Sequence, residues 1–427
     1  MIPVHAGHSM IKGLRPVFQV LLAVLFMEAG LGILSPLVYT QLARQDVASV
    51  LIGFVNSAYY LAFLLGTLTC HRMIDRVGHI RAYTVFAALA ANAAIAHIVL
   101  LSPISWVILH GILGYAFAGL AVIVESWLND KATEDNRGTV FGTYMGVSWA
   151  ASGLGPLAIG YQESVGNAAL FVFVTIFLIT ALVPMALTTV GNPNIEEREH
   201  LPLRRLFAAS PTGVTTCFGS GLAASAFYGL LPPYATSLKL SDSELAWILS
   251  GCTIAGFIMQ FPIGWLSDQI GRRPLIVVST GVSAVMAVAV ALSGITAFAP
   301  LLTMLIVLAA TMAPVYALGV GQTNDYITKD QFVAASAGLL FTWALGATAG
   351  PIIAGYLMDT RGPAALLWYT ATAMGFTCLF TLIRMAMRRA LSPKDQGNYV
   401  PVPVTASTHG ALELDPRAEH KPHPTRT

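Results

Sequence analysis

The sequence predicts an all-α membrane protein with 12 transmembrane helices in two six-helix bundles and both termini in the cytoplasm. Three observations support this fold class. The chain of 427 residues is 56% hydrophobic and only 10% charged, whereas soluble proteins carry about 25% charged residues. Twelve apolar runs reach the length of about 20 residues that a helix needs to cross a bilayer. Motifs of the first half also return in the second half.

The expected spans are separated by short joints that contain Pro, Gly and charge, such as "LSPIS", "SLKLSDSEL" and "DTRGP". Because Pro and Gly interrupt helices, these joints mark the ends of the spans. In chain order the spans cover roughly residues 15–40, 48–70, 80–101, 104–128, 138–161, 167–190, 211–237, 243–266, 274–294, 298–322, 331–357 and 364–388.

The domain boundaries follow from one longer polar joint, "GNPNIEEREHLPLRRLF", between spans six and seven. We expect an N-terminal bundle over 1–190, a cytoplasmic central loop over 191–210 and a C-terminal bundle over 211–390. The tail over 391–427 is polar and contains Pro, which predicts disorder. The first apolar run is expected to be a retained span, because no cleavage site of a secretory signal follows it.

The positive charges orient the spans. Lys and Arg in short loops stay on the cytoplasmic side of a membrane. With both termini inside, only Arg44, Lys239 and Arg361 of the 23 lysines and arginines fall in outside segments. The net charge of +2 gives no indication of a nucleic-acid partner.

An internal repeat relates the two halves. "TEDN" and "GPLAIGY" in the first half match "TKDQ" and "GPIIAGY" in the second. Asp330 follows Asp135 by 195 positions, and Gly350 follows Gly155 by the same interval. Two features in one register predict two six-helix halves in parallel repeat.

Two loops carry the resemblance to a known family. "GWLSDQIGRR" resembles the signature G-x-x-x-D-R-x-G-R-R of the major facilitator superfamily, with Gln269 in the first Arg position. "HRMIDRVGHIR" is similar to a first-half copy in which His71 replaces Gly and His79 replaces Arg. The segments "GHIRAY", "ESWLNDKATEDNRG" and "MQFPIGWLSD" are similar to the bacterial YcaD-like branch of that family. The signature positions are Asp75, Arg76, Gly78, Arg81, Gly264, Asp268, Gly271, Arg272 and Arg273.

The resemblance implies transport by rocking of the two halves about a central cavity that helices 1, 4, 7 and 10 mainly line. It also implies a cytoplasmic latch, in which Asp75 meets the helix start near Gln331 and Asp268 meets the one near Arg137. Exposed N–H groups at a helix start favour a carboxylate, so the latch would stabilise the outward-open state. The implied setting is a multi-pass protein of the bacterial inner membrane. It would act as a monomer, with the lipid bilayer and a small-molecule substrate as partners.

Three ionisable residues are candidates for proton handling in the cavity. Glu28 lies near the middle of span one, where a carboxylate is expensive and by default faces a cavity or a partner. His110 and Glu125 share a broad face of span four. We consider a Glu28–His110 proton relay, or else a histidine that bonds a backbone carbonyl. Glu125 is either a loop-pairing residue or a gate contact.

The remaining cavity candidates are Tyr228 and Tyr234 in span seven and Tyr316 and Asp325 in and after span ten. Aromatic, sparingly charged walls favour a hydrophobic or amphipathic solute over a phosphate ester, which would need several arginines. Tyr at helical spacing also fits core packing, so this pattern indicates only a broad class.

Gly-Pro motifs recur in spans five and eleven. Small residues allow close helix packing and Pro marks a bend. The first motif partly resembles a motif of proton-driven exporters. The residues are Gly155, Pro156, Gly160, Gly350, Pro351 and Gly355.

The leading functional hypothesis is therefore efflux by proton antiport, with the proton gradient as energy source and no cofactor. Uptake by proton symport and a non-transporting membrane sensor or scaffold remain alternatives. An enzyme is disfavoured, because the sequence has no Walker loop, HExxH, GxSxG or paired-carboxylate cleft. The four scattered cysteines predict no metal site.

Overall fold

The computed structural model describes residues 17–133, 136–187, 202–328, 331–387, 391–392, 396–397 and 399–401, and all the regular secondary structure in them is helical. Asp135, Asp330, the joint 188–201 and the tail beyond 401 lie outside these residues. The first half contains α2 (Phe18–Arg44), α3 (Ser49–Thr69), α4 (His71–Val77), α5 (His79–Val99), α6 (Pro103–Lys131), α7 (Arg137–Leu154), the 3₁₀ helix η2 (Gly155–Tyr161), α8 (Gln162–Val165), α9 (Asn167–Thr180) and α10 (Leu182–Ala186).

The second half repeats this order after a short helix in the central segment. It contains α11 (Leu203–Ala209), α12 (Pro211–Ser237), α13 (Asp242–Ile270), α14 (Arg272–Ser293), α15 (Phe298–Met312), α16 (Val315–Asn324), α17 (Phe332–Arg361) and α18 (Ala365–Met387). Most of the expected spans agree with these helices to within a few residues.

Eleven helical stretches in the described part of the chain are long and apolar enough to cross a membrane. The stretch missing from this set is the fifth expected span, 138–161. There α7 changes into η2 at Gly155 and Pro156. Pro lacks the N–H group that a continuous α-helix requires, so the Gly-Pro motif divides this span into an α-helical and a 3₁₀ part.

Two signature glycines begin equivalent helices in the two halves. Gly78 precedes α5 with φ 86°, and Gly271 precedes α14 with φ 94°. Side chains with a Cβ rarely adopt positive φ, whereas glycine does so readily. The spacing of this glycine within the signature therefore fixes the turn into the third helix of each half.

Within each half, glycines let helices approach backbone to backbone. A Cβ on Gly350 of α17 would collide with the carbonyl oxygen of Leu222 in α12. In the first half, a Cβ on Gly114 of α6 would collide with the carbonyl oxygen of Tyr59 in α3. Such close approach is typical of membrane helices, because packing rather than hydrophobicity drives their association.

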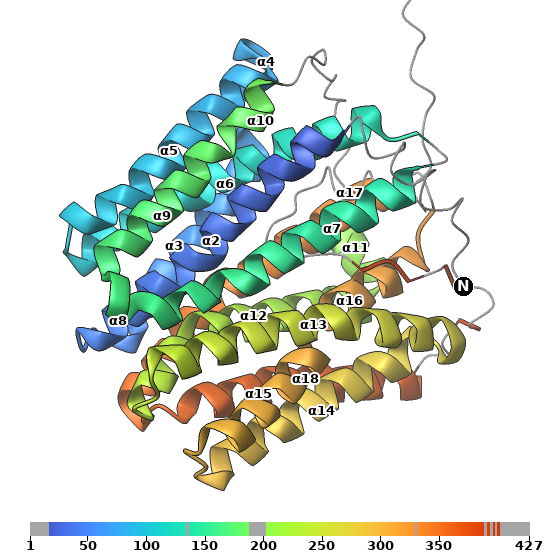
Figure 1. Ribbon diagram of the computed structural model, residues 1–427. Coiled ribbons are helices and arrows are strands. Elements are labelled where there is room, and N and C mark those ends of the chain that lie inside the picture. The colour runs from blue at the N-terminus through green and yellow to red at the C-terminus, as the bar shows by residue number, and fades with distance from the viewer. Residues whose placement is uncertain are drawn as a thin grey trace, which may run out of the picture.

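The two halves lie close together at one end and spread apart at the other (Figure 1). In Figure 1 the helices of the first half run toward the upper right, whereas α12 and α13 run nearly horizontally. We call the end that carries residues 71–81 and 264–274 the signature end, and the other end, near α8, the opposite end. Arg44, Lys239 and Arg361 all lie at the opposite end, because each ends or follows a helix there.

At the opposite end, α17 packs against α3 across the two halves. A Cβ on Gly53 would collide with the carbonyl oxygen of Pro351, and a Cβ on Gly355 would collide with that of Ser49. The second Gly-Pro motif therefore packs against both halves, since Gly350 faces α12 and Gly355 faces α3. Gly155 of the first motif lies against Gly32 of α2.

The close approach of α17 and α12 predicts the effect of one added methyl group. Gly350→Ala should destabilise the protein by about 1–3 kcal/mol, because the methyl group overpacks a backbone contact that cannot move aside. Unfolding of the purified protein in detergent, followed by circular dichroism, measures this change.

Gly142→Ala is the matched control, because nothing lies within 4 Å of a Cβ at Gly142. Replacing a helix-interior glycine by alanine there should stabilise the fold by about 0.5–1 kcal/mol. Equal unfolding temperatures for the two variants would contradict the close approach.

Candidate functional site

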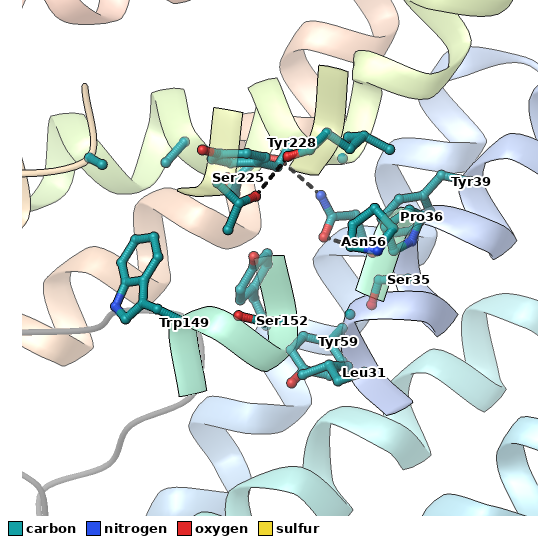
Figure 2. Close-up of a pocket in the computed structure, with 18 of the residues that line it drawn as sticks. Leu31, Ser35, Pro36, Tyr39, Asn56, Tyr59, Trp149, Ser152, Ser225 and Tyr228 are labelled. Atoms are coloured by element: carbon teal, nitrogen blue, oxygen red, sulfur yellow. Dashed lines mark hydrogen bonds between the residues drawn. The ribbon is translucent and has the colours of Figure 1, made fainter. Parts of the chain in front are cut away.

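A cavity of about 190 Å³ lies between the two halves. Its wall is formed by α2, α3, α7 and η2 of the first half and by α12, α13, α15, α16 and α17 of the second. Figure 2 shows Tyr228 and Ser225 of α12 facing Tyr59, Ser152 and Trp149 of the first half. Because both halves contribute, rocking of one half against the other must reshape this cavity.

Glu28 is the one acidic residue in the cavity wall, as far as the described residues show. Its side chain on α2 is 1% exposed, and its Oε1 atom has no hydrogen-bond partner. Tyr59, also in the wall, has a buried hydroxyl without a partner. Unsatisfied buried polar atoms are unfavourable unless a proton or a ligand compensates them. Glu28 therefore has the properties of a site that takes up a cation or a proton.

Glu125 lies behind Glu28, outside the cavity lining. It is fully buried on α6, and its carboxylate accepts a hydrogen bond of 3.1 Å from the Tyr144 hydroxyl of α7. Both acids are buried in the first half, Glu28 on α2 and Glu125 on α6.

His110 bonds another histidine rather than lining the cavity. Its Nδ1 lies 3.3 Å from Nε2 of His97, and Nδ1 of His97 lies 2.7 Å from the Ala93 carbonyl oxygen. The Nε2 atom of His110 is buried without a hydrogen-bond partner, and the centroid of its ring lies 5.6 Å from that of Tyr39. No hydrogen bond joins His110 to Glu28 in the described residues, so the relay partner considered from the sequence is not in contact with Glu28 here.

Two of the three candidate tyrosines line the cavity. Tyr228 of α12 and Tyr316 of α16 belong to the wall, whereas Tyr234 is buried outside it. Trp343 of α17 was not among the residues predicted from the sequence. Its ring centroid lies 5.4 Å from that of Tyr60 in α3 and 6.3 Å from that of Tyr316. In the sequence, Trp343 is an aromatic residue seven positions before Gly350. Helical spacing alone does not tell whether such a residue lines a cavity or packs in the core.

Asp359, another residue that the sequence analysis missed, joins the halves at the opposite end. Its Oδ1 accepts a hydrogen bond of 2.7 Å from the N–H of Ser49, and its Oδ2 accepts one of 2.9 Å from the N–H of Val50. These are first-turn N–H groups of α3, which have no partner within their own helix. A carboxylate from α17 thus caps a helix of the other half.

Two further contacts hold the same end closed. Arg44 at the end of α2 forms an ion pair with Asp242 at the start of α13. Deeper in the protein, Asn56 donates from Nδ2 to the Ser225 carbonyl oxygen at 2.9 Å and accepts from the Tyr39 hydroxyl at 3.1 Å (Figure 2). The closed end is therefore held by polar contacts as well as by the glycine packing.

At the signature end, the latch expected from the family is open. Asp75, Arg76 and Arg81 are exposed, and Asp75 makes no hydrogen bond or ion pair within the described part of the chain. Asp268 accepts a hydrogen bond of 2.7 Å from the N–H of Tyr399, in the C-terminal tail. Among the described residues, neither aspartate hydrogen-bonds to a helix of the other half.

The basic residues of the second signature bind within their own half. Arg272 is almost fully buried and donates from Nε to Asp325 at 2.5 Å. Arg273 donates to the Tyr326 hydroxyl at 2.9 Å, and its guanidinium lies over that ring. Asp325, a cavity candidate from the sequence, is therefore placed at the signature end as the partner of Arg272.

The described part of the tail makes ordered contacts, although the sequence predicts disorder from residue 391. Gly397 and Tyr399 hydrogen-bond to residues of α13, α14 and the end of α16, and Val400 is buried. The described residues contain no group of three or more His, Cys, Asp or Glu side chains that could hold a metal ion.

Comparison with known proteins gives the family. The model of the Major Facilitator Superfamily matches residues 20–234 and 213–414. An MFS-type transporter of Enterobacter sp. (strain 638) is 30% identical over 375 residues, which cover 87% of this chain and 96% of that protein. The MFS-type transporter YcaD of Escherichia fergusonii is 27% identical over 374 residues, with the same shares of both chains.

Solved structures share the fold. A variant of the nucleoside transporter NupG superposes with a TM-score of 0.70 and 12% identity, over 88% of this chain and all of that one. An inward-facing, occupied bacterial homologue of the human lysosomal transporter Spinster gives a TM-score of 0.69 and 16% identity, over 89% of this chain and 97% of that one. These proteins are membrane transporters rather than enzymes, and the family model covers most of the sequence. The chain is a multi-pass membrane protein that belongs to the major facilitator superfamily.

Proposed function

We propose that this protein exports a small hydrophobic or amphipathic organic solute across the bacterial inner membrane in exchange for protons. The observation that carries the proposal is Glu28, a buried carboxylate with an unpaired oxygen in the wall of the cavity between the halves. Insertion scales put the cost of a charged side chain at the bilayer centre near 2.5–3.5 kcal/mol. Protonation of Glu28 removes that charge, which makes this residue the natural coupling site.

The position of Glu28 supports exchange rather than co-transport. Because its carboxylate lies in the cavity wall, a bound solute and a bound proton use the same group. If the two exclude one another, proton binding releases the solute and solute binding releases the proton. Glu125 supports this role, since a second acid behind the first increases the attraction for either occupant.

The arrangement of the halves supports alternating access. The signature end carries most of the basic residues, so we assign it to the cytoplasm. With the opposite end closed and the signature end spread, the structure then corresponds to the inward-open state (Figure 1). The open Asp75 and Asp268 latch fits this assignment, because the latch is expected only in the outward-open state.

The first prediction for this function concerns Glu28→Gln. The variant should lose transport driven by a pH gradient, because glutamine takes up no proton, while counterflow at saturating solute persists. Sealed vesicles with a pH-sensitive dye measure both processes, with a solute selected by a thermal-shift screen of the purified protein. Glu163→Gln, an exposed acid on α8, is the matched control and should behave like the wild type.

The sign of the proton movement distinguishes exchange from co-transport. Solute added to the outside of energised inside-out vesicles should dissipate the pH gradient under antiport. A wild-type pH dependence in Glu28→Gln would contradict the proposed coupling site.

The second prediction concerns the closed opposite end. Asp359→Ala should shift the population toward the outward-open state, because it removes both caps on α3. Carboxylates at helix starts contribute about 0.3–1 kcal/mol each, so the ratio of states should change about two- to fivefold. Electron–electron double resonance between spin labels at Val183 and Val278, both exposed near the signature end, should report shorter distances.

Thr360→Ala is the matched control for Asp359→Ala. The Thr360 hydroxyl bonds only carbonyl oxygens of its own helix, so its loss should leave the distance distribution unchanged. An unchanged distribution in Asp359→Ala as well would show that the caps do not hold this end closed.

A further inference from the structure

The chemistry of the cavity wall identifies a class of solute. Among the described residues, the wall contains one acid, Glu28, and no Lys, Arg or His. Its other large side chains are mostly aromatic: five tyrosines and two tryptophans belong to it. An anionic solute would meet a buried negative charge with no positive partner, so the wall selects against anions.

The aromatic rings come from both halves and face one another. Tyr60 of α3 meets Trp343 of α17 edge-on, with ring centroids 5.4 Å apart and an interplanar angle of 84°. Tyr316 of α16 lies on the other side of Trp343. Ring faces attract cations, tryptophan most strongly, and aromatic cages are a recurring site for quaternary ammonium groups.

Glu28 and Tyr59 supply the polar atoms that such a solute requires. Glu28 Oε1 and the Tyr59 hydroxyl are both buried in the wall without hydrogen-bond partners. A cation beside Glu28 compensates the buried carboxylate, and an N–H donor of a protonated amine can also satisfy the unpaired oxygen. A neutral solute leaves Glu28 to be compensated by a proton alone.

We infer that the cavity binds a monovalent organic cation, with an ammonium group beside Glu28 and an apolar or aromatic body against the rings of Tyr60, Tyr228 and Trp343. The inference rests on the proposed function, because the cation and the proton compete for the same carboxylate. At about 190 Å³, the cavity suits a compact cation of one aromatic ring and a small ammonium group.

The probe for this inference is benzyltrimethylammonium, and its control is neopentylbenzene, which has the same shape without the charge. With the full-length protein in nanodiscs, equilibrium dialysis of radiolabelled benzyltrimethylammonium should show saturable binding. Neopentylbenzene should compete at least tenfold more weakly. Binding in weakly buffered solution should release protons, because the cation displaces the proton of Glu28.

Glu28→Gln should bind benzyltrimethylammonium at least tenfold more weakly and release no protons, whereas Glu163→Gln should match the wild type. Glu28→Asp, which keeps the charge, should retain most of the binding and thereby exclude misfolding as the cause. Equal affinity for the charged and uncharged compounds, or unchanged cation binding in Glu28→Gln, would overturn the inference.

The outcome is separable from that of the proposed function. If Glu28→Gln still binds the cation as the wild type does but loses transport driven by pH, the placement of the ammonium group beside Glu28 is wrong and the coupling site stands. If the cation binds at Glu28 with proton release but no pH gradient drives transport in vesicles, the solute class stands and the proposed transport fails.

A second inference comes from the tail, independently of the cavity. Residues 396, 397 and 399–401, which we call the tail segment, lie on the second signature loop. The backbone of Gly397 bridges the buried ion pair between Arg272 of this loop and Asp325: the Gly397 N–H donates to Asp325 at 3.1 Å, and the Gly397 carbonyl oxygen accepts from Arg272 at 2.5 Å. The Tyr399 N–H donates a hydrogen bond to the Asp268 carboxylate, and the Tyr399 hydroxyl donates one to the Gln260 side chain.

The signature glycine is what admits the tail segment. A Cβ on Gly264 would collide with the Tyr399 ring. In the first-half copy of the signature, His71 stands at the corresponding position. The glycine that lets the Tyr399 ring approach is therefore a feature of the second signature loop and not of the first.

We propose that the tail segment is a built-in brake that holds the signature end open. In the latch expected from the family, Asp268 meets the start of α7 when this end closes, and here the Tyr399 N–H already donates to that carboxylate. Detachment of the tail then precedes each return to the outward-open state.

The test compares two truncations of the full chain. Deletion of 396–427 should raise the fraction of molecules with a closed signature end, on the order of threefold or more. Deletion of 402–427 removes most of the tail but keeps the tail segment, so it should match the wild type. The readout is electron–electron double resonance between labels at Val183 and Val278, in a background without Cys70, Cys217, Cys252 and Cys378.

Gly264→Ala tests the same contact without shortening the chain and should reproduce the deletion of 396–427. A synthetic peptide of residues 391–403 should reverse that deletion, whereas the same peptide with Tyr399→Ala should not. The brake is overturned if deletion of 396–427 leaves the distance distribution as in the wild type, or if both truncations change it equally.

Discussion

The contact between α17 and α3 at the opposite end is the constraint on which the rest of the structure depends. Gly53 and Gly355 let the two helices approach at backbone distance, and Asp359 supplies the partners that the first N–H groups of α3 lack. Because this contact joins the halves at one end only, they can spread at the other. The cavity between the halves is the consequence. The contact closes it at the opposite end, and aromatic residues of both halves form its wall.

Glu28 places a buried carboxylate in the wall of this cavity. In a wall that contains no basic residue among those described, a buried carboxylate is unfavourable when charged and uncompensated. In the proposed function, a proton and an organic cation each remove this penalty and compete for the same carboxylate. Such coupling would need no long relay, and His110 lies beside His97 rather than beside Glu28.

A carboxylate caps a helix start of the other half at the opposite end, and the latch expected from the family would use the same interaction at the signature end. At the opposite end Asp359 is engaged with α3, whereas at the signature end Asp75 is exposed and Asp268 is bound to Tyr399. Each such cap contributes only about 0.3–1 kcal/mol. Under the proposed role of the tail segment, a few hydrogen bonds would be enough to outweigh one of these caps.

The sequence by itself determined the spans, the two halves and the family. Apolar run length fixes where helices cross a bilayer, and the signature repeats of Gly78 and Gly271 fix equivalent turns, because both properties are local. Only the tertiary structure decided which polar residues meet. Asp325 became the partner of Arg272 instead of a cavity residue, Trp343 joined the cavity wall, Asp359 capped α3, and Tyr399 lay on Gly264. These contacts join residues far apart in the chain, and the rotation and depth of each helix, which a hydrophobic pattern leaves undetermined, decide them.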